Sequence, residues 1–199
     1  KGIDEYPEQI PHAYVDGTFN TATGKYGYGL VIVHNNLIIH LENGVAEDDS
    51  ERALRQIPGE LKAAIKAMEY AVSNKLSHIV IFHDYEGICH HATGAWERKE
   101  KSSQLYHEIY NNFNKKNYLN ITFVKVDSHT NDTYNEIADE LAKVAAGLEI
   151  NSVVEKILKT TPIKVENEFL KEKLKVIISS NLDYNIEIIT SNVENRFIS

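Results

Sequence analysis

The sequence predicts an α/β fold in which a mixed five-stranded sheet carries helices on both faces and a small α/β appendage follows. Two observations predict this fold. Three runs with strand character follow one another through short turns, which is typical of an antiparallel meander. Beyond them, helical periodicity alternates with short apolar runs, which is typical of parallel strands joined by helices. The expected order is βββαβαβα, in which three antiparallel strands precede two parallel ones.

The three strands of the predicted meander are short. The first, residues 13–16, is an apolar run that ends on an acid, and a turn rich in Gly, Thr and Asn follows it through Gly24. β-Branched side chains mark the second strand at residues 28–34. A tight turn at residues 35–36 leads to the return strand at residues 37–41.

Helical periodicity becomes clear from Pro58 onward, where apolar side chains recur on one face. These side chains are Leu61, Ala64, Ile65, Met68 and Val72. Because proline favours the first turn of a helix, this helix is expected to begin between Arg52 and Pro58, with Glu60 in its first turn or two. Residues 79–82 form a continuous apolar run, which fits a parallel strand buried on both faces.

The next elements complete the alternating pattern. A short helix is expected at residues 85–91. A longer helix follows, marked by Leu105, Ile109 and Phe113. Residues 121–126 then form the fifth strand of the sheet.

The stretch from Val126 to Lys143 contains a strand end, a loop and a helix that opens on polar residues. The apolar face of this helix consists of Ile137, Ala138, Leu141, Ala142 and Ala145. Asp139 lies beside that face, where a carboxylate without a partner is costly. Two interpretations stay open. Asp139 either pairs with a nearby lysine or backbone N–H, or it joins other acids at a functional site.

The chain divides into three parts. Residues 1–10 are expected to be irregular, residues 11–148 form the main domain, and residues 149–199 form a C-terminal α/β appendage. Within the appendage, a strand is expected at residues 186–190, and a helix is marked by Phe169, Leu170, Leu174, Ile177 and Ile178. The appendage carries no recognisable chemistry. Dimerisation or binding of a protein partner, contact with substrate, and simple cover for the last helix all stay open as its role.

Composition excludes some classes of protein. No apolar run approaches the ~18 residues that a membrane helix needs. Cys89 is the only cysteine, which excludes an internal disulfide, and no stretch resembles a secretory signal. We therefore expect a cytoplasmic protein. The chain begins at Lys1 rather than at methionine, which fits a sequence that has been shortened at its start.

The net charge of −8 bears on possible partners. All of it lies in residues 1–150, because residues 151–199 are neutral overall. General electrostatic attraction to nucleic acid needs the opposite sign. If this protein handles nucleic acid, it must therefore use local basic positions and bound cations.

Four carboxylates stand out by position: Asp16 at the end of the first strand, Glu60 at the start of the first long helix, Asp84 after the fourth strand, and Asp139 on the last helix. If strands one and four are neighbours, their two acids emerge at one edge, where ligands bind in open α/β sheets. Clustered acids repel one another unless metal ions neutralise them. Oxygen ligands favour Mg²⁺ or Mn²⁺, and two such ions about 4 Å apart are a known device for phosphodiester cleavage.

Four segments, in order over roughly residues 12–147, resemble type 1 ribonuclease H. They are AYVDGT at 13–18, GELKAA at 59–64, IFHDYEGI at 81–88, and Ser128-His129 with NEIADELA at 135–142. The resemblance implies the ribonuclease H-like fold and an Asp-Glu-Asp-Asp set at Asp16, Glu60, Asp84 and Asp139 that holds two Mg²⁺ ions, with Mn²⁺ as a substitute. It also implies cleavage of the RNA strand of RNA–DNA hybrids, leaving a 3′-hydroxyl and a 5′-phosphate.

His129 lies ten residues before Asp139, as in the mobile catalytic loop of the family. The resemblance implies that it assists proton transfer or product departure. The alternative is an ordinary loop histidine. The other eight histidines are expected to be surface or packing residues, because they lack a second ligand pair at metal spacing.

Substrate selection must use the 2′-hydroxyl, the group that marks RNA within a hybrid. The resemblance places the backbone around Gly17, Thr18 and Glu60 to read it. A basic-aromatic cluster is a candidate for contacts with the phosphates of the DNA strand, and its alternative is a solvated helix end. This cluster consists of Trp96, Arg98, Lys99 and Lys101.

The sequence departs from the family pattern in two places that bear on hybrid affinity. His90-His91 stand where many close relatives carry a tryptophan, and the basic region near Trp96 has fewer lysines than the long protrusion of some relatives. Some relatives also carry an upstream hybrid-binding module, and the start at Lys1 fits the removal of such a part.

Two other functions stay open. One is a hybrid- or RNA-binding module of the same fold that has lost catalysis, which the intact set of acids disfavours. The other is a different member of the superfamily, such as a DNA-strand-transferring or exonucleolytic enzyme. The Asp139 helix and the His129 loop favour the ribonuclease over this second alternative.

Overall fold

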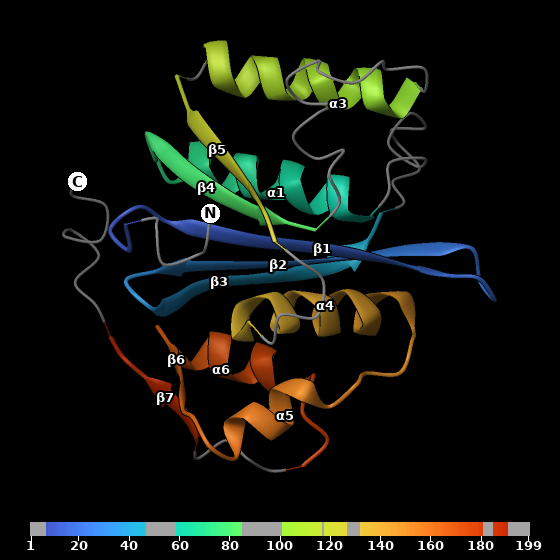
Figure 1. Cartoon of the computed structure of the whole chain (residues 1–199), viewed down its shortest axis with the longest axis vertical. Coiled ribbons are helices and arrows are strands. Elements are labelled where there is room, and N and C mark those ends of the chain that lie inside the picture. The colour runs from blue at the N-terminus through green and yellow to red at the C-terminus, as the bar shows by residue number, and fades with distance from the viewer. Residues whose placement is uncertain are drawn as a thin grey trace.

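The computed structural model of the 199-residue chain describes residues 7–46, 59–84, 101–116, 118–126, 132–180 and 185–190. Its centre is a seven-stranded sheet in the order β5-β4-β1-β2-β3-β6-β7 (Figure 1). The strands are β1 (His12–Asn20), β2 (Lys25–His34), β3 (Leu37–Val45), β4 (His78–His83), β5 (Asn120–Lys125), β6 (Ile163–Val165) and β7 (Ile186–Ile188). The helices are α1 (Gly59–Ser73), α3 (Lys101–Asn111), α4 (Thr133–Ala146), α5 (Val153–Leu158) and α6 (Glu168–Lys175), with a π-helical turn, η3 (Asn112–Lys116), after α3.

The mixed sheet predicted from the sequence is confirmed. β1, β2 and β3 pair antiparallel, whereas β4 pairs parallel with both β1 and β5. The tight turn between β2 and β3 is also confirmed, since Asn35 and Asn36 have φ values of 53° and 61°. Asparagine tolerates this left-handed conformation, which two-residue hairpin turns require. The predicted start of the first long helix and the short helix predicted at residues 85–91 lie outside the described residues.

The first strand is longer than the sequence predicts. β1 continues past Asp16 to Asn20, and this extension pairs with β2 from Tyr28 to Lys25. The prediction that Asp16 ends the strand was therefore wrong, because the Gly- and Thr-containing run after it forms a hairpin arm rather than a turn. Cross-strand backbone pairing offsets the weak strand propensity of this run.

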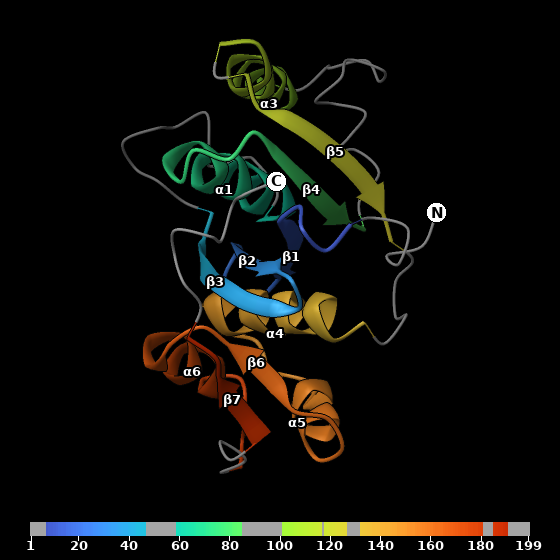
Figure 2. The same cartoon turned by 90° about the vertical axis from the view of Figure 1, so that its left-hand side faces the viewer.

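Two apolar cores lie on the two faces of the sheet. On one face, α1 and α3 cover β1, β2 and β4 through side chains such as Leu61, Met68 and Tyr106, which are at most 2 % exposed. On the other face, α4 lies across β1 and β2 and contributes Ile137 and Leu141. Figures 1 and 2 show α1 and α4 on opposite sides of the sheet. The predicted helices on both faces are confirmed.

The C-terminal unit, defined here as the described residues from Glu149 onward, continues the same sheet. β6 pairs parallel with β3 at Ile38 and Val165, and β7 pairs parallel with β6. The sheet therefore has two strands beyond the five expected. Residues of α5, β6 and α6 belong to the same apolar cluster as α4, and Figure 2 shows them on the side of α4 away from β1 and β2.

Within the part of the chain that is described, every helix is too short or too polar to cross a bilayer.

The start of α4 generates a stability prediction. Asp132 caps the helix, because its side chain accepts hydrogen bonds from Tyr134 N at 3.0 Å and Asn135 N at 3.3 Å. Asp132→Ala is expected to lower the free energy of unfolding by about 1 kcal/mol, the usual cost of losing such a cap. Urea denaturation followed by circular dichroism measures this change. Ser152→Ala is the matched control, since the side chain of Ser152 makes no cap hydrogen bond for α5; equal losses in the two variants would contradict the prediction.

Candidate active site

Two of the four predicted acids come from neighbouring parallel strands in matched register. The last residue pair between β1 and β4 is Tyr14 with Phe82, and their rings stack with centroids 4.7 Å apart. Asp16 and Asp84 each follow that pair by two residues. Because parallel strands run in the same direction, both acids emerge at the same place, where β1 and β4 diverge. The sequence-based expectation of a shared edge is consistent with this register.

A close backbone contact brings the third acid to the same edge. Glu60 is the second residue of α1, and it is 9 % exposed. A Cβ atom on Gly17 would lie 2.1 Å from Glu60 N, and one on Gly59 would lie 2.0 Å from Gly27 O. Neither position has room for a side chain. The start of α1 therefore packs with its backbone directly against β1 and β2.

Glu60 also contacts the fourth strand. Its Oε1 atom accepts a hydrogen bond of 2.8 Å from Asp84 N. This bond links the start of α1 to the end of β4, so Glu60 lies between the two strands that carry Asp16 and Asp84. The backbone amide of Gly17 in turn donates to Asp16 Oδ1 at 2.8 Å.

Asp139 reaches the site from the opposite face of the sheet, on α4. Its Oδ2 atom lies 2.9 Å from Lys143 Nζ, one helical turn further along. This ion pair confirms the interpretation that Asp139 pairs with a nearby lysine. The negative charge of Asp139 also acts on Asp16, so the two interpretations left open by the sequence are compatible.

The electrostatics of Asp16 show that the acids are close enough to act on one another. Burial raises the pKa of Asp16 well above its ordinary value, and the negative charges of Glu60 and Asp139 raise the pKa further. The hydrogen bond with Asp139 also raises it, whereas the bond from Gly17 N lowers it. Several carboxylates that meet in a partly buried site disfavour their own charged forms. A cation would relieve this repulsion.

The predicted metal ligands are not arranged around a common point in this structure. Among the described residues, no three acidic, histidine or cysteine side chains form a group that could hold a metal ion. Two oxygens of the set are already engaged, Glu60 Oε1 by Asp84 N and Asp139 Oδ2 by Lys143 Nζ. The structure thus brings the acids to one edge without assembling them as a ligand shell.

Several predicted site residues lie outside the described part of the chain. These residues are His129, Trp96, Arg98 and Lys99. Lys101 is the first residue of α3, but its side chain is not described. Gly17 and Thr18 are half-buried on β1 beside the acids, as expected from their position after Asp16.

Sequence reasoning missed two residues of the site. Gly59 permits the contact between α1 and β2, and Lys143 is the charged partner of Asp139. Lys143 could have been found, because an acid and a lysine four residues apart on a helix face each other. Gly59 gave no comparable signal, since its role depends on the position of Gly27 in another strand.

A separate cavity of about 530 Å³ lies where β1 begins, beside the start of α4 and the connection between α5 and β6. Tyr14, Tyr134 and Lys164 are among its lining residues, and none of the four acids is. The cavity and the acidic edge are therefore different places on the molecule.

The raised pKa of Asp16 generates a pH-dependent prediction. The folded protein holds the proton of Asp16 more tightly than the unfolded chain, so this proton contributes stability at low pH that is lost as the pH rises through the raised pKa. Asp16→Asn removes that loss. Urea unfolding in a chelator is expected to show the variant more stable than the parent at pH 8, with the difference shrinking toward pH 4.

Glu69→Gln serves as the control, since Glu69 lies on α1 away from the acidic edge and its side chain is 48 % exposed. It is expected to change stability little at either pH. If Asp16→Asn were less stable than the parent at both pH values, the charge repulsion described above would not be the dominant effect at this position.

Comparison with known proteins places this geometry in context. The structure is similar to RNase H1 from the halophilic archaeon Halobacterium salinarum NRC-1, with a TM-score of 0.56 and 22 % identity over 69 % of this chain and 98 % of that chain. It is also similar to LC11-RNase H1 from compost, solved in complex with an RNA/DNA hybrid, with a TM-score of 0.56 and 21 % identity over 69 % of this chain and 96 % of that one. At these identities, the likeness shows the fold.

A third similar structure is the N-terminal RNase H domain of rv2228c from Mycobacterium tuberculosis, with a TM-score of 0.56 and 15 % identity over 74 % of this chain and 97 % of that chain. A comparison with curated proteins returns no significant match. The RNase H family profile matches residues 9–147, which is more than half of the chain. With the sheet order and the acids at its edge, this match shows that the chain belongs to the RNase H family.

Proposed function

We propose that this protein is an endoribonuclease that hydrolyses the RNA strand of RNA–DNA hybrids and leaves a 3′-hydroxyl and a 5′-phosphate. The observation that carries the proposal is the convergence on Asp16: the charges of Glu60 and Asp139 both act on this buried carboxylate, and Glu60 is bonded to the backbone of Asp84. A domain that only binds nucleic acid gains nothing from this repulsion. Membership of the RNase H family supports the same activity.

The donor set fits divalent magnesium. Its members are all carboxylates, and hard oxygen ligands are those that Mg²⁺ prefers, with Mn²⁺ as a substitute. Burial raises the pKa of Asp16, and the charges of Glu60 and Asp139 raise it further, so a cation would offset the negative charge at this site. Two such ions would supply the activation of water and the stabilisation of the leaving oxygen. Asp16, Glu60, Asp84 and Asp139 are the residues that would hold them.

The protein groups around the acids have distinct parts in this proposal. The packing of Gly59 on Gly27 fixes the start of α1, so Glu60 is held at the edge without a flexible hinge. Lys143 balances the charge of Asp139. This ion pair would have to break before Asp139 could bind a metal ion. His129, which precedes α4 in the sequence, would assist proton transfer or product departure.

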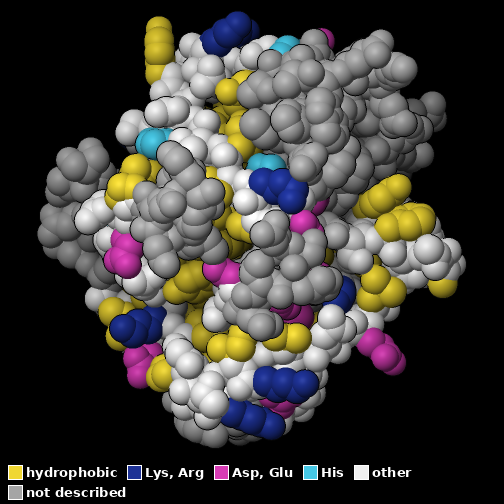
Figure 3. All heavy atoms as spheres, in the orientation of Figure 1, with side chains coloured by type: hydrophobic (Ala, Val, Ile, Leu, Met, Phe, Trp, Pro, Cys, Tyr) yellow, Lys and Arg dark blue, Asp and Glu magenta, His cyan; other side chains and the backbone are white. Residues whose placement is uncertain are grey.

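The proposed substrate is a hybrid duplex, as in the complex of LC11-RNase H1. Backbone groups of Gly17 and Thr18 would contact the 2′-hydroxyls, because they border Asp16 on β1. Figure 3 shows acidic and basic side chains scattered singly over one face, with no continuous basic surface among the residues that it describes. Phosphate contacts would therefore depend on Trp96, Arg98, Lys99 and Lys101 and on the bound ions. In keeping with its single cysteine, we propose that the enzyme acts in the cytoplasm.

One observation favours a second candidate. Lys143 pairs with Asp139, and the described acids do not form a complete set of metal ligands. An incomplete set is what a hybrid- or RNA-binding module with weak catalysis would have. The two candidates differ in turnover. Binding of a hybrid without cleavage in Mg²⁺ would support the second and contradict the first.

The acids generate a direct prediction about activity. Asp84→Asn and Glu60→Gln are each expected to lower the rate of hybrid cleavage in Mg²⁺ by at least about a hundredfold, since even outer partners of metal ligands are worth 10–100-fold. A fluorescent hybrid substrate followed over time measures the rate. Glu69→Gln is the matched control, because it makes the same chemical change on the same helix and should leave the rate unchanged. Undiminished activity of Asp84→Asn would overturn the metal-dependent mechanism.

The second prediction concerns the substrate. Among duplexes of one sequence, the hybrid is expected to be cut, while the all-RNA and all-DNA duplexes remain intact, because only the hybrid combines 2′-hydroxyls with a DNA strand. The products should carry 5′-phosphates, which a phosphatase removes, and 3′-hydroxyls, which a polymerase extends. Cleavage of the all-DNA duplex at a similar rate would instead favour another activity of the superfamily.

A further inference from the structure

The residue after Asp139 is a buried carboxylate with an unusual pair of partners. Glu140 is 0 % exposed, and its Oε1 atom accepts hydrogen bonds from Val153 N at 2.8 Å and Val154 N at 3.4 Å. These two amides are the first of α5, where a helix has N–H groups without partners of its own. Ser152, the residue in the cap position, makes no side-chain bond to them. Glu140 of α4 thus caps a helix of the C-terminal unit.

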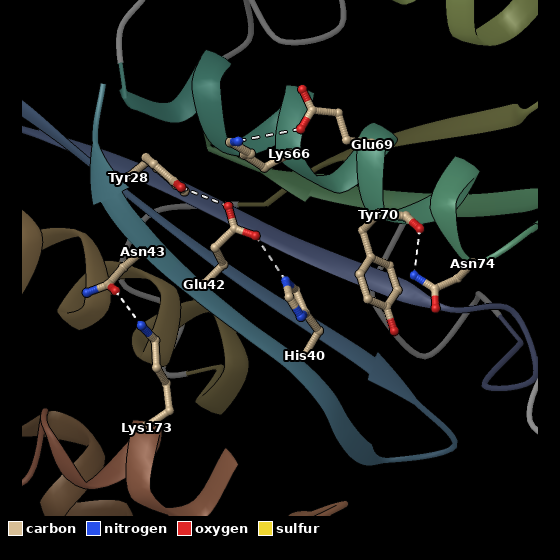
Figure 4. A network of polar contacts seen from close by, with 9 residues as sticks. All are labelled: Tyr28, His40, Glu42, Asn43, Lys66, Glu69, Tyr70, Asn74 and Lys173. Carbon is tan, nitrogen blue, oxygen red and sulfur yellow. Dashed lines mark hydrogen bonds and ion pairs between the residues drawn. The ribbon is translucent and has the colours of Figure 1, made fainter. Parts of the chain in front are cut away.

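A second polar connection joins the C-terminal unit to the next residue of α4. Asn43 on β3 donates from Nδ2 to Leu141 O at 3.0 Å and accepts at Oδ1 from Lys173 Nζ of α6 at 2.9 Å. Figure 4 shows Lys173 extending from α6 to Asn43. α5 therefore attaches directly to α4 at position 140, whereas α6 is linked to position 141 through Asn43 of β3.

The sheet holds α4 through backbone and side-chain contacts. Cβ atoms on Gly27 and Gly29 would lie 2.2 Å from Ala142 O and 2.0 Å from Ala138 O, so α4 rests on bare backbone of β2. Asn20 on β1 also donates from Nδ2 to Ala146 O at 2.8 Å. The C-terminal unit adds a second layer on the other side of the helix.

On the side of α4 away from the sheet, Val154, Leu158, Leu170 and Leu174 are at most 3 % exposed and share one apolar cluster with Ile137 and Leu141. This layer and the two polar connections oppose movement of the helix away from β1.

We propose that the C-terminal unit positions Asp139 for catalysis, with Glu140 and Asn43 as its points of attachment to α4. The inference rests on the proposed function. It assigns the unit a part in the active site although none of its residues reaches the acids. Glu140 and Asn43 are positioning residues, since they act through the backbone of α4.

The test compares three full-length variants. Glu140→Ala removes the cap of α5, Glu140→Gln keeps an oxygen that both amides can use, and Ser179→Ala removes a hydrogen bond of 2.7 Å to Glu155 that lies wholly within the C-terminal unit. Hybrid cleavage is measured in Mg²⁺ at a temperature where circular dichroism shows each variant folded. Calorimetry with Mg²⁺ alone provides a readout that is independent of turnover, and Asp139→Asn shows what loss of the carboxylate does to this binding.

Glu140→Ala is expected to lower kcat about tenfold, with KM changed less than twofold. It is also expected to weaken Mg²⁺ binding, as Asp139→Asn does. Glu140→Gln should restore both quantities to within about twofold of the parent, and Ser179→Ala should match the parent. A tenfold change in rate corresponds to about 1.4 kcal/mol. A purely structural role of Glu140 would lower the unfolding temperature without this split between kcat and KM.

Two results would overturn the inference alone: a folded Glu140→Ala with parental kcat and Mg²⁺ affinity, or a Ser179→Ala with an equal loss. A parent that binds Mg²⁺ without cleaving the hybrid would overturn the proposed function, and the inference would then be decided by Mg²⁺ affinity across the same variants. A parent that neither cleaves nor binds Mg²⁺ would overturn both.

Discussion

The repulsion among carboxylates around Asp16 is the constraint on which the rest of the site depends. Charged groups in a partly buried place are unfavourable unless other contacts hold them there. In this protein, contacts between backbone segments hold the acids in place. The register of β1 and β4 brings Asp16 and Asp84 to the same edge, and the contact of Gly59 with Gly27 fixes the start of α1, which carries Glu60. The site is therefore assembled at a cost in folding free energy, which the two apolar cores offset.

Asp139 is held differently from the other three acids. Asp16 and Asp84 belong to the sheet or follow it directly, and Glu60 is bonded to the backbone of Asp84. Asp139 instead lies on a helix that packs against glycines, and its own ion pair with Lys143 is internal to that helix. The C-terminal unit offers α4 a second supporting layer. We propose that this layer helps the sheet to fix the position of Asp139.

Much of the fold could be predicted from local pattern. The β-branched run of β2, the Asn35-Asn36 turn and the apolar face of α1 each specify a local conformation, and all three agree with the structure. The predictions that failed depended on pairing over long distances. β1 was expected to end at Asp16 because the stretch rich in Gly, Thr and Asn after it was interpreted as a turn, whereas pairing with β2 extends the strand to Asn20. β6 and α5 were missed because they are short and are stabilised by contacts with β3 and α4.

The sequence by itself determined the identity of the four acids, the order of the elements that carry them, and the family to which they point. The order of the elements follows from residue types and from periodicity within single elements, and the family follows from the resemblance of four short segments; neither needs knowledge of distant neighbours. Only the tertiary structure decided two of the contacts that hold the site: Gly59 against Gly27, and Glu140 at the start of α5. Both contacts join different elements, and their geometry exists only once the sheet and its helices have packed.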